Sequence, residues 1–320
     1  MTRVTRVTRS GRPVSAVIAF VALGLAMTLG ACEPGDRAPA RSPKPRPCPP
    51  PPEPAYQASV VATIGKLHMV ESRYPLSKLG DVLSAFKPDL VLVAVRVEAF
   101  REAQLEDASF EMTYVAHLAK QHGVNVEPID WFREQDLTAA AAPAEPWDVA
   151  EIVKKEAEVL AQPPLYTFEQ ANGAELEQKV LLATGAEARY RAGNPLVARR
   201  QAWMQNLVAS AVTRHGRPKR VLAFVDVLDR PAVDLSLHGV GYTMREPVEL
   251  VSKSKDEMIA DIPADVIRAW RAQLERSRSK ADGAKAGPEK TYWTARQKTL
   301  AVVVDKKGAC CVMPSALAAP

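Results

Sequence analysis

Continuous apolar segments alternate with amphipathic ones over the first half of the chain, from about residue 57. Apolar runs at residues 58–64, 90–95 and 124–129 predict three strands. Between them, apolar residues recur at helical spacing in residues 75–86 and 110–122, which predicts two helices. Strands that are apolar throughout and are joined by helices are typical of a parallel sheet with both faces covered.

The pattern becomes helical in the middle of the chain and then returns to strands. Helical spacing predicts a helical insertion at about residues 145–215, packed over one end of the sheet. Further predicted elements are strands at residues 221–225, 240–244 and 300–304, a helix around Val266, Trp270 and Leu274, and a loop at residues 277–288. We therefore expect an α/β fold, a mostly parallel sheet with covering helices and a helical insertion, over residues 57–313, followed by a frayed tail at residues 314–320.

The first 31 residues do not fit this pattern. Four arginines and no acidic residue precede an uncharged apolar run at residues 14–31, as in a secretory signal peptide. The run leads into Leu-Gly-Ala-Cys at residues 29–32, the pattern of a lipoprotein cleavage site. We expect cleavage before Cys32 and its modification by fatty acyl chains such as palmitate, two of which suffice for stable anchoring. An uncleaved transmembrane anchor is the alternative.

Residues 32–56 have the composition of a spacer. Ten of the 24 residues at positions 33–56 are proline, which favours an extended chain over a packed core. Of the formal net charge of +5, the four arginines of the signal contribute four, which leaves +1. Because basic and acidic residues are interspersed after the signal, we expect no nucleic-acid partner. The expected partners are the membrane, through the lipid anchor, and an envelope protein or a small ligand.

Three cysteines remain besides Cys32. Cys48 lies in the spacer, and Cys310 and Cys311 are adjacent near the end of the chain. Their spacing does not suggest a zinc site. Free thiols and one disulfide both stay open, since adjacent cysteines bridge each other only with strain.

Polar residues follow the predicted strands, where parallel α/β sheets bind ligands. They are His68, Glu98, Asp130, Asp226 and Asp229, with Glu111 at the start of a helix. An imidazole and carboxylates can act as acids, bases or metal ligands. His68, Glu98 and Glu111 are therefore the catalytic candidates, and His68, Glu98 and Asp229 are the candidate metal ligands. A purely structural role is the alternative for a single histidine.

The order of these motifs resembles the superfamily that joins TraB/PrgY proteins, Tiki proteases, ChaN-like lipoproteins and erythromycin-esterase-like enzymes. The resemblance covers roughly residues 58–250 and rests on Gly65-x-x-His68, Lys87-Pro88-Asp89, a helix near Glu111, a strand ending in Asp130, and Lys219-Arg220-Val221-Leu222. It implies a TraB/ChaN-like α/β domain and, in the working members of the family, metal-dependent hydrolysis.

The catalytic set that the resemblance implies is incomplete in this chain. The family pattern has a glutamate at the end of the second strand and a second Gly-x-x-His after a late strand. Arg96 stands where the glutamate is expected, and the segment Asp226-Val-Leu-Asp229 replaces the second Gly-x-x-His. A guanidinium neither ligates a metal nor accepts a proton. Two residues can still complete the catalytic set. Glu98 lies on the same side as Arg96 if the strand continues by two residues, and Asp229 can supply an oxygen ligand in place of the second histidine.

No serine-hydrolase elbow, phosphate loop or His-Glu-x-x-His motif is present in the sequence. The Arg199-Arg200 pair begins a helix, where the dipole disfavours cations, and suggests either an anionic ligand or a solvated helix face. The sequence thus predicts an extracytoplasmic lipoprotein, tethered to a membrane of the cell envelope, whose domain has lost its catalytic set and binds a ligand or partner. The alternative is a peptide or ester hydrolase with manganese, cobalt or zinc on His68 and nearby carboxylates.

Overall fold

The structure of the chain is a computed structural model. It describes residues 55–103, 105, 108–132, 167–181, 196–251 and 262–311, all of which belong to one unit, Pro52–Pro320. The expected signal peptide, Cys32, the spacer up to residue 54 and the tail at residues 314–320 lie outside the described residues. So do residues 145–166 and 182–195 of the expected insertion.

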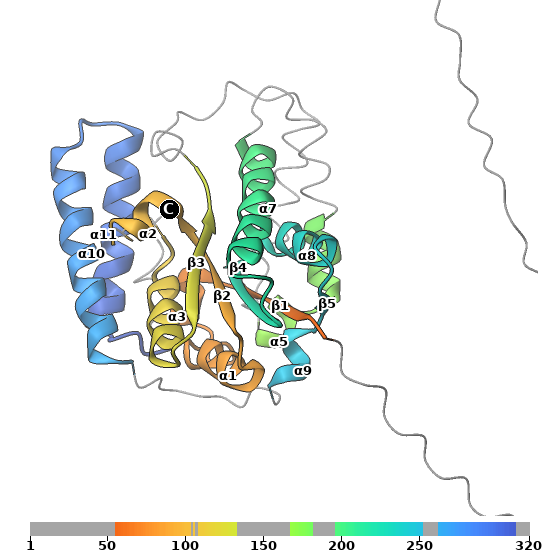
Figure 1. The fold of residues 1–320 in the computed structure, drawn as a ribbon. Coiled ribbons are helices and arrows are strands. Elements are labelled where there is room, and N and C mark those ends of the chain that lie inside the picture. The colour runs from red at the N-terminus through yellow and green to blue at the C-terminus, as the bar shows by residue number, and fades with distance from the viewer. Residues whose placement is uncertain are drawn as a thin grey trace, which may run out of the picture. The chain divides into compact units, whose positions relative to one another are not determined.

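Five strands form one parallel sheet in the described part of the chain (Figure 1). They are β1 (Gln57–Thr63), β2 (Leu90–Arg96), β3 (Asn125–Asp130), β4 (Arg220–Asp226) and β5 (Thr243–Met244), in the order β3-β2-β4-β1-β5. Each strand runs parallel to its neighbours. The prediction of an α/β fold with a mainly parallel sheet is confirmed.

Alternate side chains of the strands enter two separate cores. Val61 and Phe224 belong to the core of one face, and Val60 and Ala223 to that of the other. The first face is covered by α1 (Ser77–Phe86) and α3 (Phe110–Gln121), with α10 (Ala264–Gly283) and α11 (Pro288–Asp305) outside them; the second is covered by α7 (Leu196–Arg214) and α8 (Arg230–Gly239). Burial of both faces explains why the strands are apolar at almost every position.

Short elements make up the other connections. They are η1 (Gly65–Met69) after β1, α2 (Val97–Arg101) after β2, α5 (Phe168–Ala171) and a helical segment at residues 174–181 before α7, and α9 (Pro247–Leu250) after β5. The strand predicted at residues 240–244 is shorter than expected. The N–H groups of Gly241 and Tyr242 still close the end of α8, by bonding to the carbonyls of His238 and Leu237, so only Thr243–Met244 can pair with β1.

The expected insertion is helical where it is described, but α7 lies on a face of the sheet and not over its end. This helix connects β3 to β4 and buries Met204, Val208 and Ala211 in the core that it shares with α8. The predicted placement is wrong for this segment, because a parallel connection from β3 to β4 needs a crossover helix against the sheet.

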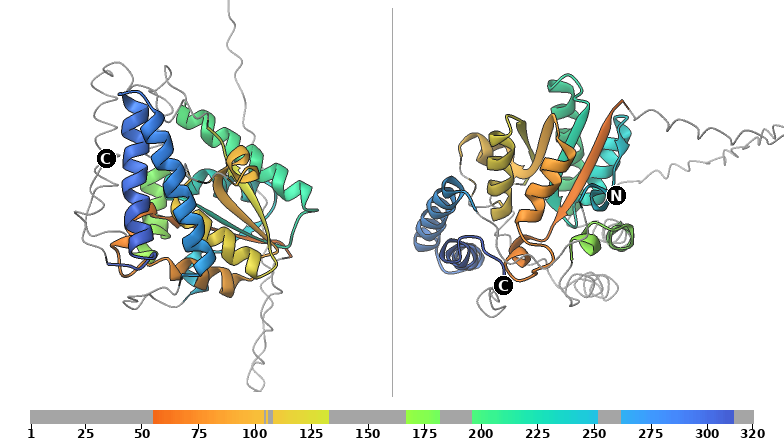
Figure 2. Two further views of the ribbon diagram at one scale, coloured as in Figure 1. Left: turned by 90° about the vertical axis from the view of Figure 1, so that its left-hand side faces the viewer. Right: turned by 90° about the horizontal axis from the view of Figure 1, so that it is seen from below.

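The loop predicted at residues 277–288 is confined to residues 284–287, and the strand predicted at residues 300–304 is wrong. Residues 277–283 continue α10, residues 300–304 belong to α11, and the two helices lie side by side (Figure 2). Ser277 and Ala281 extend the buried stripe of α10, while Trp293, Leu300 and Val303 form that of α11. The β-branched residues at 302–304 favour a strand locally, but packing at helical spacing decides the structure.

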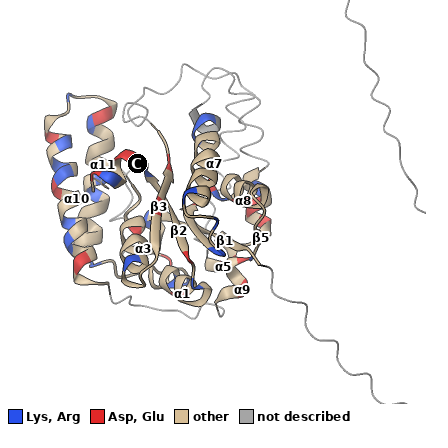
Figure 3. Ribbon diagram, in the orientation of Figure 1, with Lys and Arg blue, Asp and Glu red and all other residues tan. Residues whose placement is uncertain are grey.

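Charged residues of both signs lie along α10 and α11 (Figure 3). None of the described helices is long and apolar enough to cross a membrane. Cys310 and Cys311 carry free thiols, and Cys48 lies outside the described residues.

Candidate functional site

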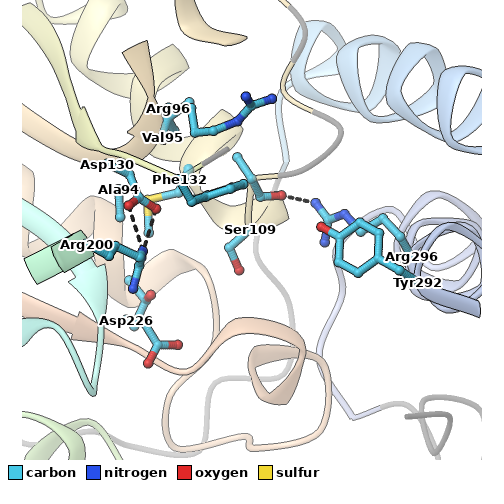
Figure 4. Close-up of a pocket in the computed structure, with 13 residues that line it drawn as sticks. Ala94, Val95, Arg96, Ser109, Asp130, Phe132, Arg200, Asp226, Tyr292 and Arg296 are labelled. Carbon is cyan, nitrogen blue, oxygen red and sulfur yellow. Dashed lines mark hydrogen bonds and ion pairs between the residues drawn. The ribbon is translucent and has the colours of Figure 1, made fainter. Parts of the chain in front are cut away.

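Four neighbouring strands end in residues that line a single pocket of about 440 Å³ (Figure 4). These residues are Thr63 of β1, Arg96 of β2, Asp130 of β3 and Asp226 of β4. The pocket therefore lies at the carboxyl edge of the sheet. The chain runs from β1 to β2 and β3 and then returns to place β4 between β1 and β2, and such a reversal of strand order is where open parallel sheets bind ligands.

The other walls of the pocket come from β2, from the segment after β3, from the start of α3, from α7 and from α11. They consist of Ala94, Val95, Ala108, Ser109, Met112, Phe132, Arg200, Tyr292 and Arg296. The α10–α11 pair reaches the pocket because it is hydrogen-bonded to the start of α3. The indole N–H of Trp270 donates to the carbonyl of Phe110 over 2.9 Å, and Arg296 donates to the carbonyl of Ala108.

Arg200 holds two carboxylates beside the pocket. Its Nε and Nη2 each lie 2.8 Å from an oxygen of Asp130, and its Nη1 lies 2.8 Å from Oδ1 of Asp229. The planar guanidinium suits this arrangement, because its N–H groups can bind two carboxylates at once. The anions that Arg200 binds in the structure are thus side chains from β3 and from the loop after β4.

The two aspartates after β4 lie in a region where negative charge is disfavoured. Burial raises the pKa of Asp229 to about 7, although Arg200 opposes this rise, and Oδ2 of Asp229 has no hydrogen-bond partner among the described residues. Asp226 is exposed and lines the pocket. Desolvation raises the pKa of Asp226 and the nearby Glu111 raises it further, while the N–H of Leu228, 3.0 Å from Oδ1, lowers it.

Glu111, in the first turn of α3, is completely buried behind the pocket. Neither of its carboxylate oxygens has a hydrogen bond of ordinary geometry among the described residues. Burial raises the pKa of Glu111, and the N–H of its own residue and the hydroxyls of Ser109 and Thr63 oppose this rise. Ser109 and Thr63 line the pocket, so the structure places Glu111 beside it, as expected of a catalytic candidate.

His68 does not face the pocket as a ligand or base would. It is fully buried in η1, where Nδ1 donates to the carbonyl of Tyr74 over 2.8 Å and Nε2 accepts from the N–H of Ile64 over 3.3 Å. Its ring also packs edge-on against the ring of Tyr74. Burial lowers the pKa of His68 to about 4, so the imidazole is neutral and both nitrogens are engaged in holding its own loop.

Glu98 is also separated from the other candidates. β2 ends at Arg96 and α2 begins at Val97, so Glu98 lies on an exposed position of a helix and not on the next strand position on the side of Arg96. Glu98 could replace the missing glutamate only if β2 continued for two residues beyond Arg96, and it does not. Arg96 itself lines the pocket, with its guanidinium carbon 5.0 Å from the ring centroid of Phe132.

The donor set of this site does not fit a divalent metal. Asp130 and Asp229 are bound by Arg200, and the lone pair of His68 is taken by a backbone N–H. Within the described ranges, no three His, Cys, Asp or Glu side chains come together as metal ligands. The structure thus gathers Asp130, Asp226, Asp229 and Glu111 around the pocket but leaves His68 and Glu98 apart.

Comparison with models of protein families, with curated proteins and with solved structures finds no match for this chain. The resemblance to the TraB/ChaN-like superfamily therefore stays a prediction.

The sequence does not identify Tyr292 or Arg296. It identifies Arg200 only as one of a pair of arginines that suggests an anionic ligand or a solvated helix face. The two residues of α11 were missed because the sequence predicts a loop at residues 277–288 and a strand at residues 300–304 and no element between them. The spacing of Trp293, Leu300 and Val303, which repeats on one side of a helix, was the signal that could have found this helix. No pattern in the sequence pairs Arg200 with Asp130, since the two are 70 residues apart.

Proposed function

We propose that this chain is a membrane-tethered lipoprotein of the cell envelope whose α/β domain binds a small ligand in the pocket at the carboxyl edge of the sheet, without converting it. The observation that carries this proposal is the engagement of Asp130 and Asp229 by Arg200. A guanidinium that binds both carboxylates at 2.8 Å competes with a metal ion for them, and its positive charge opposes the binding of a cation.

The size and position of the pocket support a small ligand more than a protein partner. Its volume of about 440 Å³ is in the usual range for small-molecule sites, which extend from about 300 to about 1,000 Å³. Four strand ends supply polar groups, and Ala94, Val95 and Met112 supply apolar surface. A few polar groups in a mostly apolar concave site are typical of ligand recognition.

A metal titration of the purified full chain in detergent tests the absence of metal-dependent catalysis. We expect calorimetry with manganese, cobalt and zinc to give no stoichiometric binding by the wild type. We expect Arg96→Glu to gain affinity, because it exchanges a positive charge for a ligand at the end of β2. Stoichiometric binding by the wild type that Asp229→Asn removes, together with ester or peptide cleavage, would contradict the proposal and establish the hydrolase alternative.

A thermal-shift screen of the full chain with small organic compounds tests the pocket itself. A ligand at about 100 times its Kd stabilises the folded state by about 2.7 kcal/mol, enough for a clear rise in Tm. Ala94→Leu fills part of the pocket and should abolish that rise. Ala85→Leu is the matched control, since Ala85 lines a different cavity at the opposite edge of the sheet. Equal stabilisation of both variants would place the ligand elsewhere.

A further inference from the structure

Basic residues gather at the amino edge of the sheet, which lies opposite the pocket. Because the strands are parallel, the segments that lead into β2, β3 and β4 meet at this edge. These segments are residues 87–89, 120–124 and 214–219, and in the sequence they are far apart. Together with the first residue of β4 they form a basic edge of six exposed side chains, which are Lys87, Lys120, Arg214, Arg217, Lys219 and Arg220.

Acidic side chains compensate the charge of the basic edge only in part. Within the described residues, the same segments contain one carboxylate, Asp89, whose Oδ2 accepts from a backbone N–H of β4 over 2.9 Å. Glu127 of β3 binds Arg214 over 3.0 Å. Arg245, which follows β5, is paired with Glu249 over 3.5 Å and does not change the balance. Six basic side chains against two carboxylates leave an excess of four positive charges.

The chain also enters the domain at this edge (Figure 1). The described residues begin two positions before β1, whose first residue, Gln57, donates its N–H to the carbonyl of Lys219 over 2.8 Å. The guanidinium carbon of Arg217 lies 4.3 Å from the ring centroid of Tyr56. The point at which the segment from Cys32 joins the domain is therefore held among the residues of the basic edge.

We infer that the basic edge is a membrane-contact surface, which binds the anionic headgroups of phospholipids. The inference rests on the proposed function, because the tether at Cys32 is what brings this edge to a membrane. Lysine and arginine side chains are attracted to an anionic bilayer over about one Debye length, about 8 Å at physiological ionic strength. The pocket, at the opposite edge of the sheet, then faces away from the lipid and stays open to its ligand.

The tether makes a weak attraction sufficient. The segment between Cys32 and the described chain, residues 33–54, has 22 residues and spans at most about 80 Å even when fully extended. The domain is therefore kept near the membrane at a high effective concentration. A tether alone leaves the orientation of the domain free, whereas the basic edge favours the orientation in which the entry point of the chain faces the lipid.

Lysine footprinting of the full chain tests the inference. The protein is purified in detergent and reconstituted through its anchor into vesicles of phosphatidylcholine, or of phosphatidylcholine with phosphatidylglycerol. A brief treatment with a water-soluble acylating reagent and mass spectrometry then give the rate of acylation at each lysine. The reference is Lys298, an exposed residue of α11 two positions from Arg296 of the pocket.

We expect Lys87, Lys120 and Lys219 to react at least about threefold more slowly, relative to Lys298, on the vesicles with phosphatidylglycerol. The reason is that contact with the anionic lipid shields these amines from the reagent. In about 1 M salt, where the Debye length is about 3 Å, the difference between the two kinds of vesicle should vanish.

A double variant tests whether the charges of the basic edge cause this protection. Lys219→Gln with Arg220→Gln removes two charges and should lower the protection of Lys87 by at least about half. Lys285→Gln with Lys290→Gln is the matched control, since it removes two charges from exposed positions around the start of α11 and should leave the protection unchanged. Circular dichroism checks that both variants are folded. If the first is not, the salt dependence of the wild type decides alone.

The failure of this inference can be distinguished from the failure of the proposed function. Equal acylation of the three lysines on both kinds of vesicle would overturn the membrane contact but leave the tether. Protection by a soluble polyanion such as DNA, without protection on the anionic vesicles, would overturn it in favour of a soluble partner. A wild type that does not float with vesicles of phosphatidylcholine alone would overturn the tether and the inference with it, since lipids without net charge hold the chain only through its anchor.

Discussion

His68 bonds to the backbone on both sides of its ring, to Ile64 through Nε2 and to Tyr74 through Nδ1. His68→Phe keeps the aromatic volume but leaves a buried N–H and a buried carbonyl unpaired. We expect it to lower the free energy of unfolding by about 2 to 4 kcal/mol at pH 7, measured by urea denaturation of the full chain. His122→Phe, at an exposed position after α3, should change it by about 0.5 kcal/mol or less.

The same variant should change the response to acid. The pKa of His68 is about 4 in the folded protein and 6.5 in an unfolded chain, so the unfolded state takes up the proton first as the pH falls. The wild type therefore loses stability between pH 6.5 and about 4, by at most about 3 kcal/mol from this group. His68→Phe lacks this loss, so the difference between the two proteins should shrink in acid. A difference that stays constant with pH would contradict the neutral, structural histidine.

The sequence could predict which residues follow the strands but not what each one binds. Asp130, Asp226 and Arg96 could be placed because a strand ending is a local pattern, and parallel strands bring their carboxyl ends to one edge. The pairing of Arg200 with Asp130 and Asp229 depends on how α7 crosses the sheet. Such a long-range contact leaves no trace in the periodicity of either segment.

Gly308 is where the chain leaves α11 and passes close to α10. It has a φ of +72°, and a Cβ there would lie 2.8 Å from the ring of Trp270 and 2.9 Å from Ile262. Gly308→Ala therefore combines backbone strain with overpacking and should cost about 2 to 4 kcal/mol of unfolding free energy.

Gly123 provides the matched control for this element. Its φ of +69° is nearly the same, but no atom lies within 4 Å of a Cβ built there. Gly123→Ala should therefore cost only the backbone strain, about 1 to 2 kcal/mol, measured in the same denaturation series. Equal costs at the two positions would mean that the chain at Gly308 does not pack closely on Trp270.

The helices and strands of the sheet could be predicted from the sequence because local propensity and tertiary packing agree there. β2 is apolar at both faces and is a strand, and α3 shows helical spacing and is a helix. In α11 the two disagree, since Val302–Val304 are β-branched but lie on a helix that must cover α10. Ser277 is polar and therefore favours a loop in the sequence, but it lies on the buried side of α10.

At the scale of the whole molecule, the proposed function joins two parts with separate roles. In this proposal the domain provides the pocket, and a lipid on Cys32 attaches the chain to a membrane. Sequence predicts the attachment from a short local motif, whereas the pocket appears only when strand ends, α7 and α11 are brought together. The two parts can therefore be tested independently of each other.

Replacement of Cys32 tests the tether, with Cys48 as the matched control from the same proline-rich segment. In cells given labelled palmitate, we expect the wild type and Cys48→Ser to be labelled and to partition into detergent, because two acyl chains anchor a protein stably. Cys32→Ser should carry no label. A wild type that stays in the membrane without label would instead indicate an uncleaved apolar anchor, since the lipid that we propose on Cys32 is what carries the labelled chains. In either case the pocket should keep its ligand affinity in Cys32→Ser, because the site contains no residue of the tether.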